Sequence, residues 1–85
     1  MGNRLYVGNL NFKTDEEGLK SFFAQNGAVV SARIITDKET GRSRGFGFVE
    51  METDDEASNT IEQLDGQELD GRPLRINFAR ERQPR

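Results

Sequence analysis

The sequence predicts one small α+β domain in which strands and helices follow one another in the order βαββαβ. Three observations support this order. Two segments place apolar residues at helical spacing behind capping signals, four segments rich in β-branched and aromatic residues lie around them, and turn residues separate the segments. A chain of 85 residues buries about 60 to 65% of its unfolded surface, which is enough for one core.

The first strand is predicted over "RLYVGN", residues 4–9, and the first helix over "TDEEGLKSFFAQNG", residues 14–27. Thr14 is the expected N-cap, and Glu17 three residues later completes a capping box. Gly27 is the expected end of the helix. Its apolar stripe consists of Leu19, Phe22 and Phe23.

A hairpin follows, with strands expected over residues 29–36 and 45–51 and a turn-rich link over residues 37–43. The second helix repeats the signals of the first, with Thr53 as cap and Gly66 as end. Glu56 completes its capping box, and its stripe consists of Ala57, Ile61 and Leu64.

An Asp-Gly pair within residues 69–72 predicts a small hairpin, and the last strand is expected over residues 73–79. Two βα units with right-handed crossovers give a ferredoxin-like βαββαβ sandwich, a four-stranded antiparallel sheet with two helices on one face. The single domain is expected to span residues 1–80, followed by a short flexible basic tail at 81–85. No further segment is left to cover the opposite face of the sheet.

Strand parity predicts which side chains lie on that open face. Arg44, Phe46, Phe48 and Glu50 share one side of the third strand, and Gly45, Gly47, Val49 and Met51 share the other. Because an unpaired buried charge costs several kcal/mol, the phenylalanine side should face water, while the glycines should let a helix approach closely. The other strands are expected to point Leu5, Val7, Val30, Ala32, Ile34, Leu74, Ile76 and Phe78 inward.

The open face is therefore expected to carry three aromatic rings among arginines. Half-exposed rings of this size form an apolar patch of a few hundred Å², roughly the size that marks a binding site on a small protein. Rings among guanidinium groups suit unstacked bases and phosphates. The rings are Tyr6, Phe46 and Phe48, and the arginines are Arg4, Arg33, Arg44 and Arg75.

The net charge of −3 at first argues against a nucleic-acid partner. The charges are nevertheless separated along the chain. Residues 14–27 and 52–70, the helices and their flanks, hold eleven acids and one lysine, a net charge of −10, whereas the remainder carries +7. The predicted sheet, hairpin loop and tail are thus basic.

Composition excludes several kinds of chemistry. Without cysteine or histidine the chain can form neither a disulfide framework nor a Cys-based or His-based nucleophile or metal site. "GRSRGFG" lacks the Lys-Ser/Thr of a phosphate-binding loop. We expect no cofactor, no metal, no small-molecule substrate and no enzyme activity. Neither a signal peptide nor a membrane span is apparent, so a cytoplasmic protein without membrane contact is expected.

Two short motifs resemble those of the RNA recognition motif family. "LYVGNL", residues 5–10, is similar to the family's RNP2 hexamer, and "RGFGFVEM", residues 44–51, is similar to its RNP1 octamer except that Met51 replaces an aromatic residue. The resemblance implies that Tyr6 and Phe48 each stack a base, that Phe46 packs against a sugar or between two nucleotides, and that Arg44 pairs with a phosphate. It also implies base-edge contacts by Asn77 and Ala79, with Arg80 and Arg82 at the C-terminal extension.

These features favour a monomeric module that binds single-stranded RNA, with single-stranded DNA left open. The alternative is an RRM-type protein-protein interaction module that uses the open sheet or the acidic helical face. A small hydrolase on the same sandwich lacks a credible general base. At the level of single residues, Tyr6 could be only a cross-strand partner of the phenylalanines, and Arg4, Arg33 and Arg75 could be only solvated.

Overall fold

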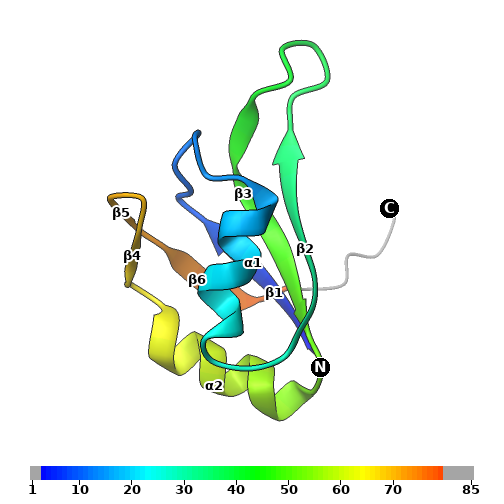
Figure 1. Cartoon of the computed structure of the whole chain (residues 1–85), viewed down its shortest axis with the longest axis vertical. Helices are drawn as coiled ribbons and strands as arrows, with labels where there is room; N and C mark the ends of the chain where they lie inside the picture. Colours follow the sequence, from blue (N-terminus) through cyan, green and yellow to red (C-terminus); the bar gives the residue numbers. More distant parts are fainter. Residues whose placement is uncertain (1–2, 80–85) are drawn as a thin grey trace.

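The computed structural model describes residues 3–79, and in them the strands and helices follow the predicted order (Figure 1). The central sheet has the strand order β2-β3-β1-β6, with every neighbouring pair antiparallel. The ferredoxin-like βαββαβ sandwich is therefore confirmed. The expected tail at 81–85 lies outside the described residues. The elements are β1 (Arg4–Gly8), α1 (Glu16–Ala24), β2 (Val29–Thr36), β3 (Ser43–Met51), α2 (Asp54–Leu64), β4 (Glu68–Leu69), β5 (Arg72–Pro73) and β6 (Arg75–Phe78).

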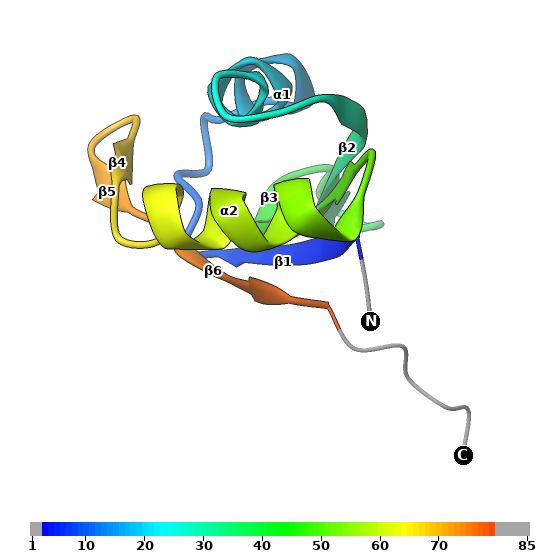
Figure 2. The same ribbon diagram turned by 90° about the horizontal axis from the view of Figure 1, so that it is seen from below.

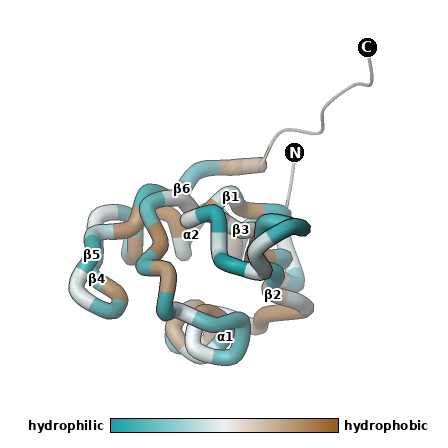
Figure 3. The backbone as a smooth tube through the Cα atoms, turned by 90° about the horizontal axis from the view of Figure 1, so that it is seen from above, coloured by the Kyte–Doolittle hydropathy of each residue, from teal (hydrophilic) through white to brown (hydrophobic). Residues whose placement is uncertain are grey.

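Both helices lie on the same side of the sheet, as Figure 2 shows. The hydrophobic core consists mainly of buried residues from the strands and from both helices. Figure 3 shows the backbone of these elements coloured by the hydropathy of each residue. Met51, which replaces an aromatic residue of the family motif, is fully buried in this core. The core residues are Leu5, Val7, Leu10, Leu19, Phe23, Ile34, Val49, Met51, Ala57, Leu64, Leu74 and Ile76.

Helix α1 begins one residue later than its capping signal predicts. Asp15 is the N-cap, and its carboxylate accepts from the Gly18 N–H at 2.8 Å. Thr14 is instead buried, and its hydroxyl donates to the Asp70 carboxylate at 2.5 Å. Gly27 does not end the helix, which stops at Ala24; a Cβ on Gly27 would lie only 3.2 Å from Met51 Cε, so this glycine serves a close approach.

Helix α2 matches its predicted signals more closely. The Thr53 hydroxyl oxygen accepts from the Glu56 N–H at 3.1 Å, and Gly66 beyond the helix has a φ of +87°. Asp70 and Gly71, with φ of +54° and +86°, form the tight turn between β4 and β5. The small hairpin predicted from the Asp-Gly pair is confirmed.

Strand β2 contains an irregularity that parity reasoning missed. Its pairing with β3 shifts between Val29 and Ser31, so Val30 is 51% exposed and Val29 packs on the core in its place. The expected inward position of Val30 is therefore wrong. Phe78 lies opposite the inward-facing Leu5, so it is on the expected face, but on the edge strand β6 it remains 45% exposed.

The two glycines of β3 are not explained by the expected close approach of a helix. A Cβ on Gly47 would lie 2.3 Å from the Arg33 carbonyl oxygen, so the close neighbour is the backbone of β2. Gly45 has a φ of +89° and lies where the β2–β3 register shifts a second time, between Ile34 and Thr36. Both glycines thus shape the sheet itself.

None of the helices in residues 3–79 is long and apolar enough to span a membrane.

Candidate nucleic-acid interface

The outer face of the sheet brings four predicted site residues into one row. Asn77 on β6 lies opposite Tyr6 on β1, Tyr6 lies opposite Phe48 on β3, and Phe48 lies opposite Arg33 on β2. Directly opposed residues of antiparallel strands point to the same face, with Cβ atoms roughly 5 Å apart. The row therefore crosses the whole sheet with two aromatic rings at its centre.

A shorter row beside it contains Arg75, Gly8 and Phe46. Phe46 completes a cluster with Tyr6 and Phe48, which we call the aromatic platform. The ring centroids are 5.9 Å apart for Tyr6–Phe46, 6.0 Å for Tyr6–Phe48 and 6.2 Å for Phe46–Phe48. The corresponding ring planes meet at 33°, 65° and 89°, within the tilted and edge-to-face range that favours aromatic pairs.

Gly8 makes room for the platform. A Cβ on this residue would lie 2.7 Å from Tyr6 Oη and 3.0 Å from Tyr6 Cε2. The tyrosine ring therefore lies over the glycine, beside Phe46, and a larger residue at position 8 would displace it.

The platform is supported but not covered. Tyr6 is 37% exposed, and Phe46 and Phe48 are half-buried by their neighbours. The helices pack on the other side of the sheet (Figure 2). The rings are thus fixed in position by one another and keep surface available to a flat ligand.

The four arginines predicted for this face are all exposed: Arg4, Arg33, Arg44 and Arg75. Arg33 and Arg75 lie in the two rows described above, and Arg4 lies opposite Glu50. Arg44 lies just before Gly45, in the part of β3 where the register with β2 shifts.

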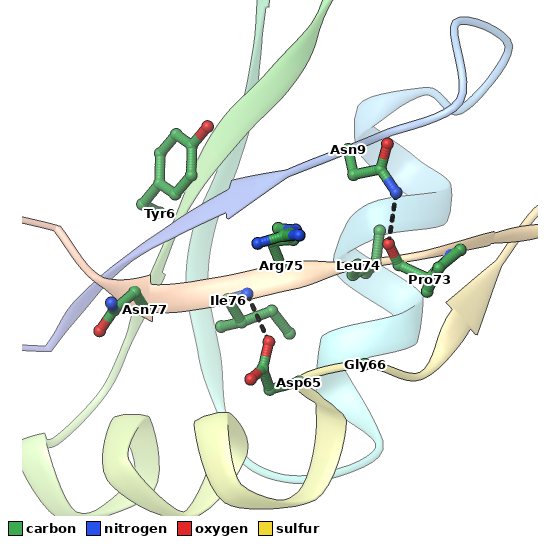
Figure 4. A pocket seen from close by; sticks show the side chains of 9 residues that line it. All are labelled: Tyr6, Asn9, Asp65, Gly66, Pro73, Leu74, Arg75, Ile76 and Asn77. Carbon is green, nitrogen blue, oxygen red and sulfur yellow. Dashed lines mark hydrogen bonds between the residues drawn. The ribbon is translucent and has the colours of Figure 1, made fainter.

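A groove of about 590 Å³ continues from the platform around strand β6, the edge of the sheet (Figure 4). Tyr6, Arg75 and Asn77 line one part of it, and Asn9 and Asp65 line another. Asp65 follows α2, and its Oδ1 accepts from the Ile76 N–H at 2.9 Å. Sequence reasoning missed Asp65, because no local pattern signals a contact with a strand eleven residues away.

Asn9 holds the loop after β1 against the β4–β5 hairpin. Its backbone has a φ of +61°, its Nδ2 donates to the Pro73 carbonyl at 2.7 Å, and its Oδ1 accepts from Arg72 Nη2 at 2.9 Å.

Phe12, in the same loop, is 66% exposed and was not predicted; its Cε1 would lie 3.7 Å from a Cβ on Gly45. An isolated aromatic residue outside a strand gives no sequence signal of exposure.

Two further predicted site residues, Asn77 and Ala79, lie at the end of β6. Asn77 is exposed, and its Oδ1 accepts from the Phe78 N–H at 2.8 Å. Ala79 is half-buried, and its N–H donates to the Arg4 carbonyl at 2.9 Å. Arg80 and Arg82, also predicted to belong to the site, lie outside the described residues. Within residues 3–79, no group of three or more metal-ligating side chains could hold an ion.

An antiparallel sheet that is backed by two helices and bears rings and arginines on its open face defines a class of small α+β binding domains. The family model of the RNA recognition motif matches residues 5–75. The chain belongs to the RNA recognition motif family.

Individual relatives agree with this assignment. The chain is 54% identical over 79 residues to the 28 kDa chloroplastic ribonucleoprotein of Spinacia oleracea, covering 93% of this chain and 34% of the relative. RNA binding protein PG1, a crystal structure, shares 56% identity with a TM-score of 0.87, covering 95% of this chain and 98% of the other. The Sxl-lethal protein in complex with RNA shares 34% identity with a TM-score of 0.84, covering 91% of this chain and 47% of the other.

The relatives also correct one expectation. Proteins at 50 to 54% identity carry chloroplastic or mitochondrial names, which points to organelles and contradicts the expected cytoplasmic location. The chain spans between about a quarter and three fifths of the length of these curated relatives.

Proposed function

We propose that this chain binds single-stranded RNA on the open face of its sheet. The observation that carries the proposal is the aromatic platform, three rings with centroids 5.9 to 6.2 Å apart on a face that the helices leave free. Stacking on such rings contributes about 1 to 3 kcal/mol per base. A comparable fold was solved with RNA, the Sxl-lethal protein at 34% identity.

Each platform residue has a distinct role in this proposal. Tyr6 and Phe48 lie directly opposite each other on adjacent strands, so each offers a ring to a different base. Phe46 packs against a sugar or between the two nucleotides. This arrangement fits an unstacked strand better than a duplex, because a duplex keeps its base faces covered.

The arginines supply phosphate contacts around the platform. Arg44 pairs with one phosphate, and the exposed Arg4, Arg33 and Arg75 are available to others. Asn77 and Ala79 read base edges next to Tyr6. Arg80 and Arg82 lie outside the described residues and are included only as contacts that the family resemblance implies. The domain acts as a monomer and without chemistry, as a binding module.

The test compares two double variants by fluorescence anisotropy with 5′-labelled octauridylate and octacytidylate. Phe46→Ala with Phe48→Ala removes two platform rings and should weaken binding by about 30-fold or more. Phe12→Ala with Phe78→Ala also removes two exposed rings, but from positions outside the platform, and should retain binding within about threefold. Far-UV circular dichroism checks that both variants remain folded.

Two results would refute the proposal. One is unchanged affinity in a folded variant that lacks Phe46 and Phe48; the other is an equal loss in both double variants. The same oligomers made with deoxyribose measure how far the site discriminates RNA from single-stranded DNA, because 2′-hydroxyl contacts alone separate the two.

A further inference from the structure

The amide of Asn77 is held in one orientation by the edge of the sheet. The Ala79 N–H donates to Arg4 on β1, so the alternate N–H groups of β6, those of Ile76 and Phe78, point away from β1. The Asp65 carboxylate accepts from the Ile76 N–H at 2.9 Å, and the Asn77 side chain accepts from the Phe78 N–H at 2.8 Å.

A backbone N–H can only donate, so the Asn77 atom that it contacts must be the carbonyl oxygen. Reversing the amide would remove this hydrogen bond and place two donors against each other. This contact occupies one lone pair of the Oδ1, whereas the two N–H donors of the Nδ2 group make no hydrogen bond within the described residues and are available to a ligand.

Asn77 also lies where a base would be read. It is exposed, it lies opposite Tyr6 in the sheet, and it lines the groove beside the platform (Figure 4). A base stacked on Tyr6 would therefore present its edge close to this amide.

We propose that Asn77 acts as a fixed hydrogen-bond donor and makes the site prefer keto bases over amino bases. This inference rests on the proposed function, the binding of single-stranded RNA on the open face of the sheet. Uracil and guanine carry a carbonyl oxygen at the position where cytosine and adenine carry an amino group. A donor in a fixed orientation can hydrogen-bond to the carbonyl oxygen of uracil or guanine. The amino group of cytosine or adenine at the same position is itself a donor and is disfavoured. Asn77 is thus a specificity-determining residue, and the Phe78 N–H positions it.

The test is the ratio of dissociation constants for octacytidylate and octauridylate, two probes of equal charge and length. The wild-type chain should bind octauridylate about three- to tenfold more tightly than octacytidylate. This ratio corresponds to the net free energy of one hydrogen bond. Asn77→Asp can still accept from the Phe78 N–H but offers the ligand an acceptor, so the ratio should fall to one or invert. Asn59→Asp adds the same charge at an exposed position on α2 and should leave the ratio unchanged.

A second pair of variants tests the positioning. Phe78→Pro removes the N–H that orients the amide, at a position where the edge of the sheet tolerates proline, and the ratio should approach one. Phe78→Ala keeps the N–H and should keep the ratio. Circular dichroism establishes which variants are folded. If Phe78→Pro does not fold, the result for Asn77→Asp alone tests whether Asn77 determines the base preference.

The outcomes separate the two proposals. Binding of neither oligomer, or binding that does not need Phe46 and Phe48, refutes the proposed function itself. Binding that needs these rings but is equal for the two wild-type complexes, or a ratio that survives Asn77→Asp, refutes the role of Asn77 alone.

Discussion

Gly47→Ala tests whether the backbone of β2 limits the side chain at this position of β3. The added Cβ would lie 2.3 Å from the Arg33 carbonyl oxygen and 3.1 Å from Ile34 Cα. Both atoms belong to the backbone, so no side-chain rotation relieves the overlap. The two strands must separate locally and weaken the hydrogen bonds between them, and overpacking of this kind costs about 3 kcal/mol.

Gly66→Ala is the matched control. Gly66 has a φ of +87°, but a Cβ there would meet nothing within 4 Å. Only the left-handed backbone conformation opposes alanine, at about 1 kcal/mol. The pair therefore separates a steric cost from a conformational one within a single protein.

Urea unfolding followed by circular dichroism measures both costs. With a slope of about 1 kcal/mol per molar urea, the midpoint should fall by about 3 M for Gly47→Ala and about 1 M for Gly66→Ala. A loss of 3 kcal/mol is a large share of the roughly 4 to 13 kcal/mol expected for a chain of this length. A Gly47→Ala midpoint equal to or above that of Gly66→Ala would contradict the steric argument.

Three further predictions concern the interface and its edge. Gly8→Ala should displace the Tyr6 ring and weaken octauridylate binding about fivefold in anisotropy titrations, while the free energy of unfolding changes by less than about 1 kcal/mol. Asp65→Ala leaves the Ile76 N–H without its acceptor and should lower the free energy of unfolding by about 1 to 2 kcal/mol in urea; an unchanged midpoint would contradict this. Arg44→Ala should reduce the slope of log affinity against log salt by about 0.7, whereas Lys20→Ala on α1 should leave it unchanged.

The order of helices and strands along the chain, and most of the outer face, were predicted from the sequence because both depend on local signals. Alternation of charged and apolar residues placed Tyr6 and Phe48 on the open side, and the structure aligns them in register. The capping signal at Thr53 was also sufficient, since its partner Glu56 is only three residues away. Where the deciding contact is local, sequence reasoning succeeded.

The failures depend on contacts between distant segments. Thr14 was expected to cap α1, but its hydroxyl donates to Asp70, 56 residues later. Val30 was expected inside, but the register shift within β2 turns it outward. Alternation gave Phe78 the correct face but not its exposure, because parity does not tell how far the helices extend over the edge of the sheet.

The distribution of charge is consistent with the proposed binding of RNA on one face, although the net charge of the chain is −3. The helix side presents exposed carboxylates in the first turn of each helix, whereas the sheet side presents the exposed arginines around the platform. A polyanion is repelled by the helix side and attracted by the sheet side. The electrostatic field of the domain therefore orients the approaching polyanion toward the sheet, in addition to strengthening the attraction. Affinity should therefore respond strongly to arginines on the sheet and weakly to charges on the helices, as the contrast between Arg44→Ala and Lys20→Ala is designed to measure.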